Sequence, residues 1–215
     1  MLTISNISCV RGHKPLFTPL SFSLQAGQAL HLEGDNGVGK TSLLRIICGL
    51  SPADSGEVLW NGHALTRQHP EVVEAFRATL CYMGHNLSLK DDLTPIENLL
   101  FEAQVAGRSL PHEKGMDALR KMGLNSRAHL PLRVLSQGQK RRTALARLSV
   151  TAAKLWVLDE PFVALDAQSL DNLRALLANH VQQGGMLLFT SHQAVESLQT
   201  NGHAIDVQPI RLVAA

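Results

Sequence analysis

The spacing of apolar residues changes along the first third of the chain. Residues 20–24 alternate between apolar and polar side chains, a period of two that predicts a β-strand. A second strand is predicted over residues 29–33, directly before a glycine-rich segment. Apolar residues then recur at helical spacing over residues 43–50, and the helix is expected to stop within residues 49–52. Residues 58–62 predict a strand that enters a tight Asn-Gly turn.

The middle of the chain favours helices. Residues 94–97, Thr-Pro-Ile-Glu, place a capping residue, a proline and a glutamate at the positions typical of a helix start. A further helix is predicted over about residues 112–122. We interpret about residues 86–135 as a mainly helical insertion. Ser136 then opens a long helix that extends through Leu148.

Strand and helix patterns alternate in the last third of the chain. Residues 155–158 form a continuous apolar run, as expected for a strand that is buried on both faces. The apolar positions of residues 170–181 share one helical face, and residues 186–190 predict another buried strand. This alternation predicts an α/β fold with a parallel sheet and crossover helices.

The composition is that of an ordinary folded protein, and it excludes several classes. Hydrophobic residues make up 45% and charged residues 18% of the 215 residues. The net charge of +2 is too small to indicate nucleic acid or an anionic membrane as a partner. The chain has no apolar run of about 18 residues that could span a bilayer. Residues 1–6 lack the pattern of a signal peptide, so we do not expect secretion.

The cysteines and histidines indicate neither a structural metal nor a haem ligand. Cys9, Cys48 and Cys81 are far apart and form no C-x-x-C motif, so neither a disulfide framework nor a zinc site is expected. A reducing compartment is the simplest interpretation. The ten histidines are scattered without an H-x-x-x-H pair, and we expect no cofactor ligation by them.

A phosphate-binding loop is predicted between the strand of residues 29–33 and the following helix. The segment matches the pattern G-x-x-x-x-G-K-[ST] and has the flanking strand and helix that the pattern requires. Glycines allow backbone N–H groups to face phosphate oxygens, and the helix N-terminus adds positive potential. Lys40 is expected to reach the β and γ phosphates of ATP, and Thr41 to ligate Mg²⁺. The alternative is a chance glycine turn. The expected phosphate-binding residues are Gly34, Asp35, Asn36, Gly37, Val38, Gly39, Lys40 and Thr41.

Two carboxylates follow the buried strand of residues 155–158. The carboxyl ends of strands are where open α/β sheets bind ligands. Asp159 is placed to hold Mg²⁺ through water. Glu160 is expected to polarise the attacking water, because one carboxylate cannot readily serve both metal and water. The alternative is a solvated acidic turn.

Further motifs make the chain resemble the nucleotide-binding domains of ABC transporters. Residues 135–139, Leu-Ser-Gln-Gly-Gln, are similar to the LSGGQ signature that opens a helix in that family. Asp166 resembles the D-loop aspartate, and His192 resembles the switch histidine. The motifs follow the family's order over nearly the whole chain. The signature residues are Ser136, Gln137, Gly138 and Gln139.

The resemblance implies a fold and a division of the chain. The implied fold is a P-loop NTPase of the ABC ATPase type, with a mainly parallel core sheet, an antiparallel β part and a helical subdomain. Residues 1–215 are expected to form a single ABC ATPase domain. Its ATP-binding core would be residues 1–85 and 136–215, and its helical subdomain about residues 86–135.

The resemblance also implies a second copy of the chain as a partner. Two copies are expected to pack head to tail, with ATP between Lys40 of one and Ser136 of the other. His192 is then expected to contact the γ-phosphate. The alternative for His192 is a histidine whose hydrogen bonds are satisfied at a strand end.

Three positions depart from the family pattern. His85 stands nine residues before Thr94, where the family has the Q-loop glutamine, and a neutral histidine can donate or accept a hydrogen bond. Arg11 stands sixteen residues before Gly27, where the family has an aromatic residue that stacks on adenine. A guanidinium plane can also stack on a base; the alternative is a solvated turn residue. Gln137 replaces the usual glycine and can crowd or hydrogen-bond the partner's nucleotide.

Within the family, the chain most resembles the ATPase subunits of the cytochrome c maturation system. Its shortness, His85, Arg11 and residues 155–166 carry this resemblance. It implies integral membrane subunits as partners, docked on residues 85–90 and the helical insertion. It also implies a place at the cytoplasmic face of the inner membrane, and hydrolysis that releases a haem-loaded chaperone. Neither haem nor nucleic acid is expected to bind this chain.

Two alternatives remain open at this point. The ATPase of another ABC importer or exporter would carry the same motifs. A soluble ABC protein that acts on nucleic acid or in cluster assembly would be expected to carry basic extensions or a tandem second domain, and the sequence shows neither.

Overall fold

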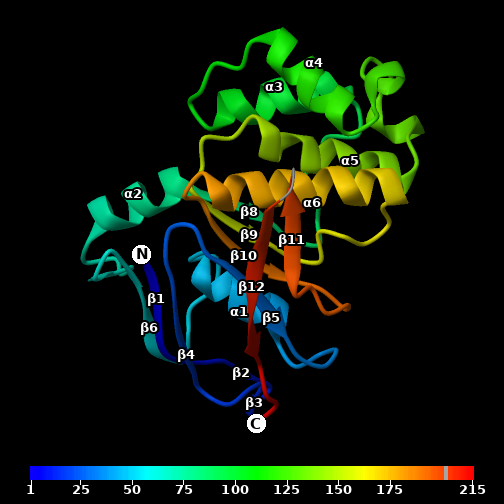
Figure 1. Ribbon diagram of the computed structural model, residues 1–215. Coiled ribbons are helices and arrows are strands. Elements are labelled where there is room, and N and C mark those ends of the chain that lie inside the picture. Colours follow the sequence, from blue (N-terminus) through cyan, green and yellow to red (C-terminus); the bar gives the residue numbers. More distant parts are fainter. Residues whose placement is uncertain (201–202) are drawn as a thin grey trace. The chain divides into compact units, whose positions relative to one another are not determined.

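The computed structural model describes residues 1–200 and 203–215 and contains two compact units (Figure 1). The first unit consists of Met1–Gly84, Ala153–Pro161 and Leu177–Ala215. The second consists of His85–Ala152 and Phe162–Leu176. The chain therefore leaves the first unit twice and returns to it each time.

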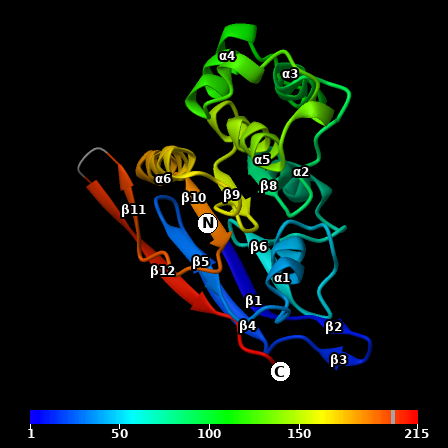
Figure 2. The same cartoon turned by 90° about the vertical axis from the view of Figure 1, so that its right-hand side faces the viewer.

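The main sheet of the first unit is mostly parallel (Figure 2). Among the described residues its strand order is β11-β12-β5-β10-β9-β8, and only β11 runs antiparallel to its neighbour. Every residue of β9 and β10 is buried, which confirms the prediction from the continuous apolar runs. The strands are β5 (Ala29–Glu33), β8 (Leu80–Met83), β9 (Leu155–Leu158), β10 (Met186–Thr190), β11 (Ser197–Thr200) and β12 (His203–Arg211).

Strands β11 and β12 were not anticipated from the sequence. β12 pairs with β11 over residues 203–206 and with β5 over residues 207–211. Pro209 lies in the second of these stretches, where β12 pairs with β5 and, among the described residues, with no strand on its other side. Proline is tolerated at such a position because one side of the strand is open. The proline masked the strand pattern in the sequence.

A second, antiparallel sheet belongs to the same unit and has the order β4-β1-β6-β7. The predicted Asn-Gly turn joins β6 to β7, with positive φ at both Asn61 (51°) and Gly62 (85°). The register of β1 shifts opposite β6, and there Gly56 (φ 79°) approaches the backbone so closely that a Cβ would lie 2.3 Å from the Asn6 oxygen. The strands are β1 (Leu2–Ser8), β4 (Leu20–Leu24), β6 (Ser55–Trp60) and β7 (His63–Ala64), with a separate hairpin of β2 (Val10–Arg11) and β3 (Lys14–Pro15).

Helix α1 (Lys40–Ile47) shares one apolar core with both sheets. Its buried face contributes Leu43, Leu44 and Ile47, which cluster with residues of β1, β5 and β10. Helix α2 (Pro70–Thr79), which the sequence analysis did not identify, adds Phe76 to the same core. Burial of α1 on this scale fixes the segment immediately before it, which is the predicted phosphate loop.

The second unit is helical. The predicted capping box is confirmed at the start of α3 (Pro95–Val105), where Thr94 and Glu97 bond reciprocally. The remaining elements are α4 (His112–Lys121), η1 (Asn125–Arg127), η2 (Leu132–Val134), α5 (Gln137–Ala146), η3 (Arg147–Ser149) and the first part of α6 (Ala167–Gln182). No helix among the described residues is long and apolar enough to cross a membrane.

The boundaries of the compact units differ from the expected core and subdomain. The boundary after Gly84 lies one residue from the expected one at residue 85. The second unit also extends to Ala152 and includes Phe162–Leu176, whereas the resemblance implied that all of residues 136–215 belong to the core. The difference has a physical reason, because α5 packs against α3 and α4.

Candidate active site

The predicted phosphate loop curves around the end of its own lysine. Lys40 Nζ donates to the carbonyl oxygen of Gly34 at 2.6 Å and to that of Asp35 at 3.2 Å. Gly34, Gly37 and Gly39 have φ of 151°, 82° and 110°, in the region that favours glycine. The turn therefore depends on its glycines, and it places a cation beside backbone groups at the start of α1.

Two buried segments support the loop from outside. A Cβ on Gly34 would lie 2.7 Å from the Leu212 carbonyl oxygen, and one on Gly39 would lie 3.0 Å from the Phe17 ring. Phe17 in turn forms a bridge with Ala214. Arg11 lies exposed on β2, in the hairpin that leads to Phe17. Within the part of the chain that the structure describes, no hydrogen bond or ion pair joins Arg11 to the loop.

Asp159 joins the loop to the strand that carries the carboxylates. Its side chain is 4% exposed and accepts hydrogen bonds at both oxygens. Thr41 Oγ1 donates to Oδ2 at 2.7 Å, and Thr190 Oγ1 donates to Oδ1 at 2.8 Å. The Asp159 backbone N–H donates to the Met83 oxygen at 2.7 Å, which ties the end of β9 to β8.

Glu160 and His192 lie next to each other at the same edge. The Glu160 N–H donates to Thr190 Oγ1 at 2.8 Å, and Glu160 takes a left-handed φ of 52°. Such a conformation costs a non-glycine residue on the order of 1 kcal/mol, and it is seen mainly where the surroundings fix it. His192 Nε2 lies 3.7 Å from Glu160 Oε1, with His192 57% and Glu160 17% exposed.

The donor set at Thr41 and Asp159 fits a small hard cation. A hydroxyl and a carboxylate are oxygen ligands of the kind that Mg²⁺ prefers. No group of three or more His, Cys, Asp or Glu side chains that could hold a metal exists within residues 1–200 and 203–215. An ion here would therefore need further ligands from phosphate oxygens and water.

Sequence reasoning missed two residues of the site. The first is Thr190, whose hydroxyl bonds the Asp159 carboxylate and the Glu160 backbone N–H. Its sequence signal was its place at the end of a buried strand, two residues before His192. Tyr82 on β8 is the second. Burial, followed by the nearby Asp159 carboxylate, raises the pKa of Tyr82 to about 12. The phenol therefore stays protonated, and able to donate a hydrogen bond, at a higher pH than an exposed tyrosine would.

The signature segment belongs to the second unit. Ser136 caps α5, as expected: its Oγ accepts from the Gln139 N–H at 3.3 Å, and Gln139 Oε1 accepts from the Ser136 N–H at 3.0 Å. Gln139 is therefore engaged in the cap, while Gln137 is exposed. A Cβ on Gly138 would lie 3.1 Å from the Ala164 oxygen, so this glycine lets the D-loop segment approach α5 closely.

Asp166 caps α6 in the same unit. Its Oδ1 accepts from the Ser169 N–H at 2.8 Å, and Arg142 Nη1 lies 3.2 Å from its Oδ2. The hydrogen bonds from Ser169 hold the pKa of Asp166 below its usual value. Asp166 thus serves a structural role within its own chain.

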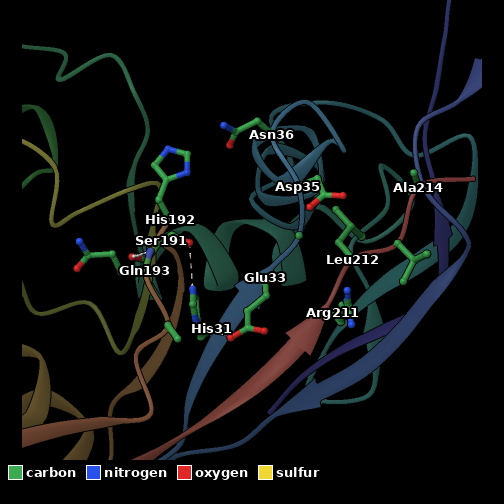
Figure 3. A pocket seen from close by; sticks show the side chains of 13 residues that line it. His31, Glu33, Asp35, Asn36, Ser191, His192, Gln193, Arg211, Leu212 and Ala214 are labelled. Atoms are coloured by element: carbon green, nitrogen blue, oxygen red, sulfur yellow. Dashed lines mark hydrogen bonds and ion pairs between the residues drawn. The ribbon is translucent and has the colours of Figure 1, made fainter.

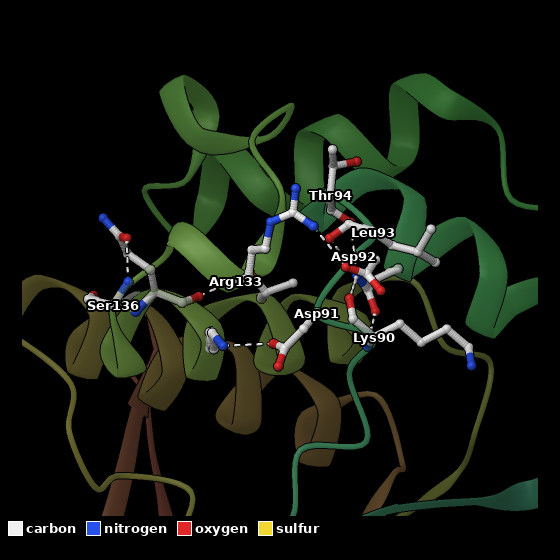
Figure 4. Close-up of polar contacts among 11 residues, drawn as sticks. Lys90, Asp91, Asp92, Leu93, Thr94, Arg133 and Ser136 are labelled. Atoms are coloured by element: carbon white, nitrogen blue, oxygen red, sulfur yellow. Dashed lines mark hydrogen bonds and ion pairs between the residues drawn. The ribbon is translucent and has the colours of Figure 1, made fainter.

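Charge pairs tie the loop before α3 to α5 and to the short helix η2 that precedes it (Figure 4). Lys140 on α5 lies 2.7 Å from Asp91, and Arg133 lies 2.8 Å from Asp92. His85, the Q-loop position, is exposed at the start of this unit.

The predicted site residues thus fall into two sets. The first unit brings together the phosphate loop, Asp159, Glu160 and His192. A cavity of about 960 Å³ extends from residues 34–36 of the loop to His192, and it is not lined by Lys40, Thr41, Asp159 or Glu160 (Figure 3). The second unit holds His85, the signature residues and Asp166.

Comparisons with known proteins identify the family and the fold of the chain. The ABC transporter family model matches residues 17–163. The chain is 48% identical to the cytochrome c biogenesis ATP-binding export protein CcmA of Dechloromonas aromatica, over 91% of this chain and 94% of that protein. It is 47% identical to the protein of the same name from Nitrosomonas europaea, over 90% and 89%. A bacterial ABC transporter cassette solved as a dimer has a TM-score of 0.80 at 19% identity, covering 98% of this chain and 94% of that chain, which shows a shared fold.

The Thr190 bridge generates a prediction about stability. Thr190→Val keeps the side-chain shape but leaves the Glu160 N–H and one Asp159 oxygen without the hydroxyl, so the free energy of unfolding should fall by roughly 1–3 kcal/mol. Thr190→Ser, which keeps the hydroxyl, is the matched control. Denaturant unfolding measures both variants. An equal free energy of unfolding in Thr190→Val and the unmodified chain would contradict the assigned role.

Proposed function

The chain belongs to the ABC transporter family, and we propose that it is the ATP-hydrolysing subunit of a membrane complex for cytochrome c maturation. The observation that carries the enzymatic part is the connected set of Lys40, Thr41, Asp159, Glu160 and His192 in one compact unit. The relatives named CcmA, about half identical over nine-tenths of the chain, support the biological assignment.

Phosphate binding would use the loop and the start of α1. The N-cap of α1 is Gly39, and no side chain caps this helix end. Its first N–H groups are therefore not used by a side chain and are available to phosphate oxygens. Lys40, which is held at 2.6 Å from the Gly34 oxygen, needs only a side-chain rotation to exchange a carbonyl for a phosphate.

Hydrolysis would use the carboxylates at the end of β9. Thr41 and Asp159 would hold Mg²⁺, which supplies charge neutralisation of the phosphates when it is bound. Glu160 would accept a proton from the attacking water, and its fixed backbone keeps the carboxylate at the edge of the sheet. His192, 3.7 Å from Glu160, would contact the γ-phosphate.

The remaining predicted residues would contact the nucleotide of a second copy or lie at the rim of the site. Ser136, Gln137, Gly138 and Gln139 would face the nucleotide of a second copy, with Asp166 at the same junction. Of these, Ser136 and Gln139 enter that contact with their side chains already paired in the cap. His85 would take the place of the Q-loop glutamine, and Arg11 would stack on adenine.

The cellular setting follows from the same proposal. The chain would bind integral membrane subunits through residues 85–90 and the helical unit, at the cytoplasmic face of the inner membrane. Neither nucleic acid nor haem would bind the chain itself. The second candidate, an ATPase of another ABC importer or exporter, shares the site and differs only in these partners.

Glu160→Gln tests the hydrolytic mechanism. The amide cannot accept the proton from water, so kcat for ATP hydrolysis should fall at least about 100-fold, while the affinity for ATP stays within about threefold. Steady-state phosphate release and binding of a fluorescent ATP analogue measure the two quantities. Glu57→Gln, at an exposed position on β6, is the control and should turn over normally. Full turnover in Glu160→Gln would remove Glu160 from its role.

Arg11→Ala tests adenine stacking. Loss of a cation–π contact should weaken ATP binding roughly 2- to 30-fold, and Arg11→Tyr should restore the affinity. Lys14→Ala is the matched control, because Lys14 pairs with Arg11 across the hairpin and carries the same charge. Titration with the same fluorescent analogue measures all three variants. Equal affinity for ATP in Arg11→Ala and the unmodified chain would contradict adenine stacking by Arg11.

Copurification tests the membrane complex. The tagged chain, purified from the detergent-solubilised membranes of its own organism, should bring with it integral subunits of the cytochrome c maturation system, identified by mass spectrometry. Recovery of a sugar or ion permease in their place would favour the second candidate function.

A further inference from the structure

A histidine is buried in the middle of the parallel sheet. His31 lies on β5 between Leu30 and Leu32, is 2% exposed, and stacks on Phe189 of β10 with the ring centres 4.9 Å apart and 6° between the planes. Burial of a polar ring costs free energy unless its nitrogens find partners. The ring packing alone would be served as well by phenylalanine.

One nitrogen of this ring bonds to a backbone oxygen beside the candidate site (Figure 3). Nε2 lies 3.3 Å from the Ser191 carbonyl oxygen, whereas Nδ1, which is 3.2 Å from Glu33 Oε1, forms no hydrogen bond with any described residue. A carbonyl oxygen only accepts, so Nε2 carries the hydrogen in the bond to Ser191. His31 therefore connects the strand before the phosphate loop to the residue before His192.

The segment that carries His192 is held from both neighbouring strands. On the β9 side, the Thr190 hydroxyl bonds to Asp159 and to the Glu160 N–H. On the β5 side, His31 holds the Ser191 carbonyl. The Ser191 hydroxyl accepts from the Gln193 N–H at 3.1 Å and so fixes the turn beyond. His192 itself is 57% exposed, and little packing restrains its ring. Its position therefore depends on its backbone.

We propose that His31 is a positioning residue for His192, acting through the hydrogen bond from its Nε2 to the Ser191 carbonyl. The inference rests on the proposed function, because it assumes that His192 contacts the γ-phosphate. The bond keeps the backbone at residue 191 in the orientation that presents the imidazole of His192 to the phosphate site. A misplaced catalytic contact reduces turnover more than it reduces nucleotide binding.

Three replacements separate the hydrogen bond from the packing. His31→Gln and His31→Met both lose the ring and have similar length, but only glutamine can donate to the Ser191 oxygen. His31→Phe keeps the stack on Phe189 and loses the donor. We expect kcat for ATP hydrolysis to fall roughly 10-fold in the Met and Phe variants, with KM and ATP affinity within about threefold. His31→Gln should retain kcat within about threefold.

Two further variants identify the route of the effect. Phe189→Leu removes the ring partner and leaves the donor, so its kcat should stay within about twofold. The double variant His31→Met/His192→Ala should be no slower than His192→Ala alone, because both changes remove the same contribution. Thermal unfolding of each variant confirms that the folded protein is being assayed.

The outcomes distinguish this inference from the proposed function. A kcat in His31→Met equal to that in His31→Gln overturns the inference. It is also overturned if kcat of the double variant falls below that of His192→Ala by the same factor that His31→Met shows alone. A Phe189→Leu variant as slow as His31→Phe assigns the effect to packing and overturns it too. If His192→Ala keeps full activity, the role proposed for His192 is wrong, and the positioning role of His31 that depends on it is wrong as well. A slow His192→Ala with normal His31 variants leaves that role intact and refutes only the positioning.

Discussion

The hydroxyl of Thr190 joins the Asp159 carboxylate to the backbone that carries Glu160. It donates to Asp159 and accepts from the Glu160 N–H, both at 2.8 Å, and it is fully buried. Because β10 lies between β5 and β9, the ends of three parallel strands meet at one edge. The phosphate loop follows β5, Asp159 and Glu160 follow β9, and His192 follows β10. The Thr190 hydroxyl bonds the end of β10 to the end of β9, and His31 bonds β5 to the residue after β10.

The sheet would supply only one side of an ATP site. In the first unit, Lys40, Thr41 and the start of α1 would face the phosphates in the proposed function, while the signature cap at Ser136 belongs to the second unit. Ser136 is held by its capping box, so it is already oriented before any partner arrives. A site completed by a second copy would be closed by ATP and opened by hydrolysis. Hydrolysis would in this way change the contact between the two copies. The charge pairs of Asp91 with Lys140 and of Asp92 with Arg133 tie the loop of residues 90–94 to α5 and to η2, on either side of that cap.

Features set by local chemistry could be predicted from the sequence, and features set by distant contacts could not. The glycine loop, the caps at Thr94 and Ser136 and the buried strands β9 and β10 each depend on neighbouring residues, and the structure has them where the pattern placed them. Strand β12 was not predicted because Pro209 argues against a strand. It is tolerated there only because β12 has an open side, which the sequence does not show. The roles of Thr190 and His31 depend on partners about 30 and 160 residues away, which no local pattern reveals. The unit boundary near residue 152 likewise depends on how α5 packs.

The most direct test of the account is the mass in solution of Glu160→Gln with different nucleotides. Size-exclusion chromatography with light scattering would measure it at saturating ATP with Mg²⁺, and again with ADP. A site shared by two copies predicts twice the mass of one chain with ATP and the mass of one chain with ADP. Adding Ser136→Arg should abolish the doubling with ATP. A single-chain mass at saturating ATP, with ATP binding verified in the same sample, would contradict the two-copy site.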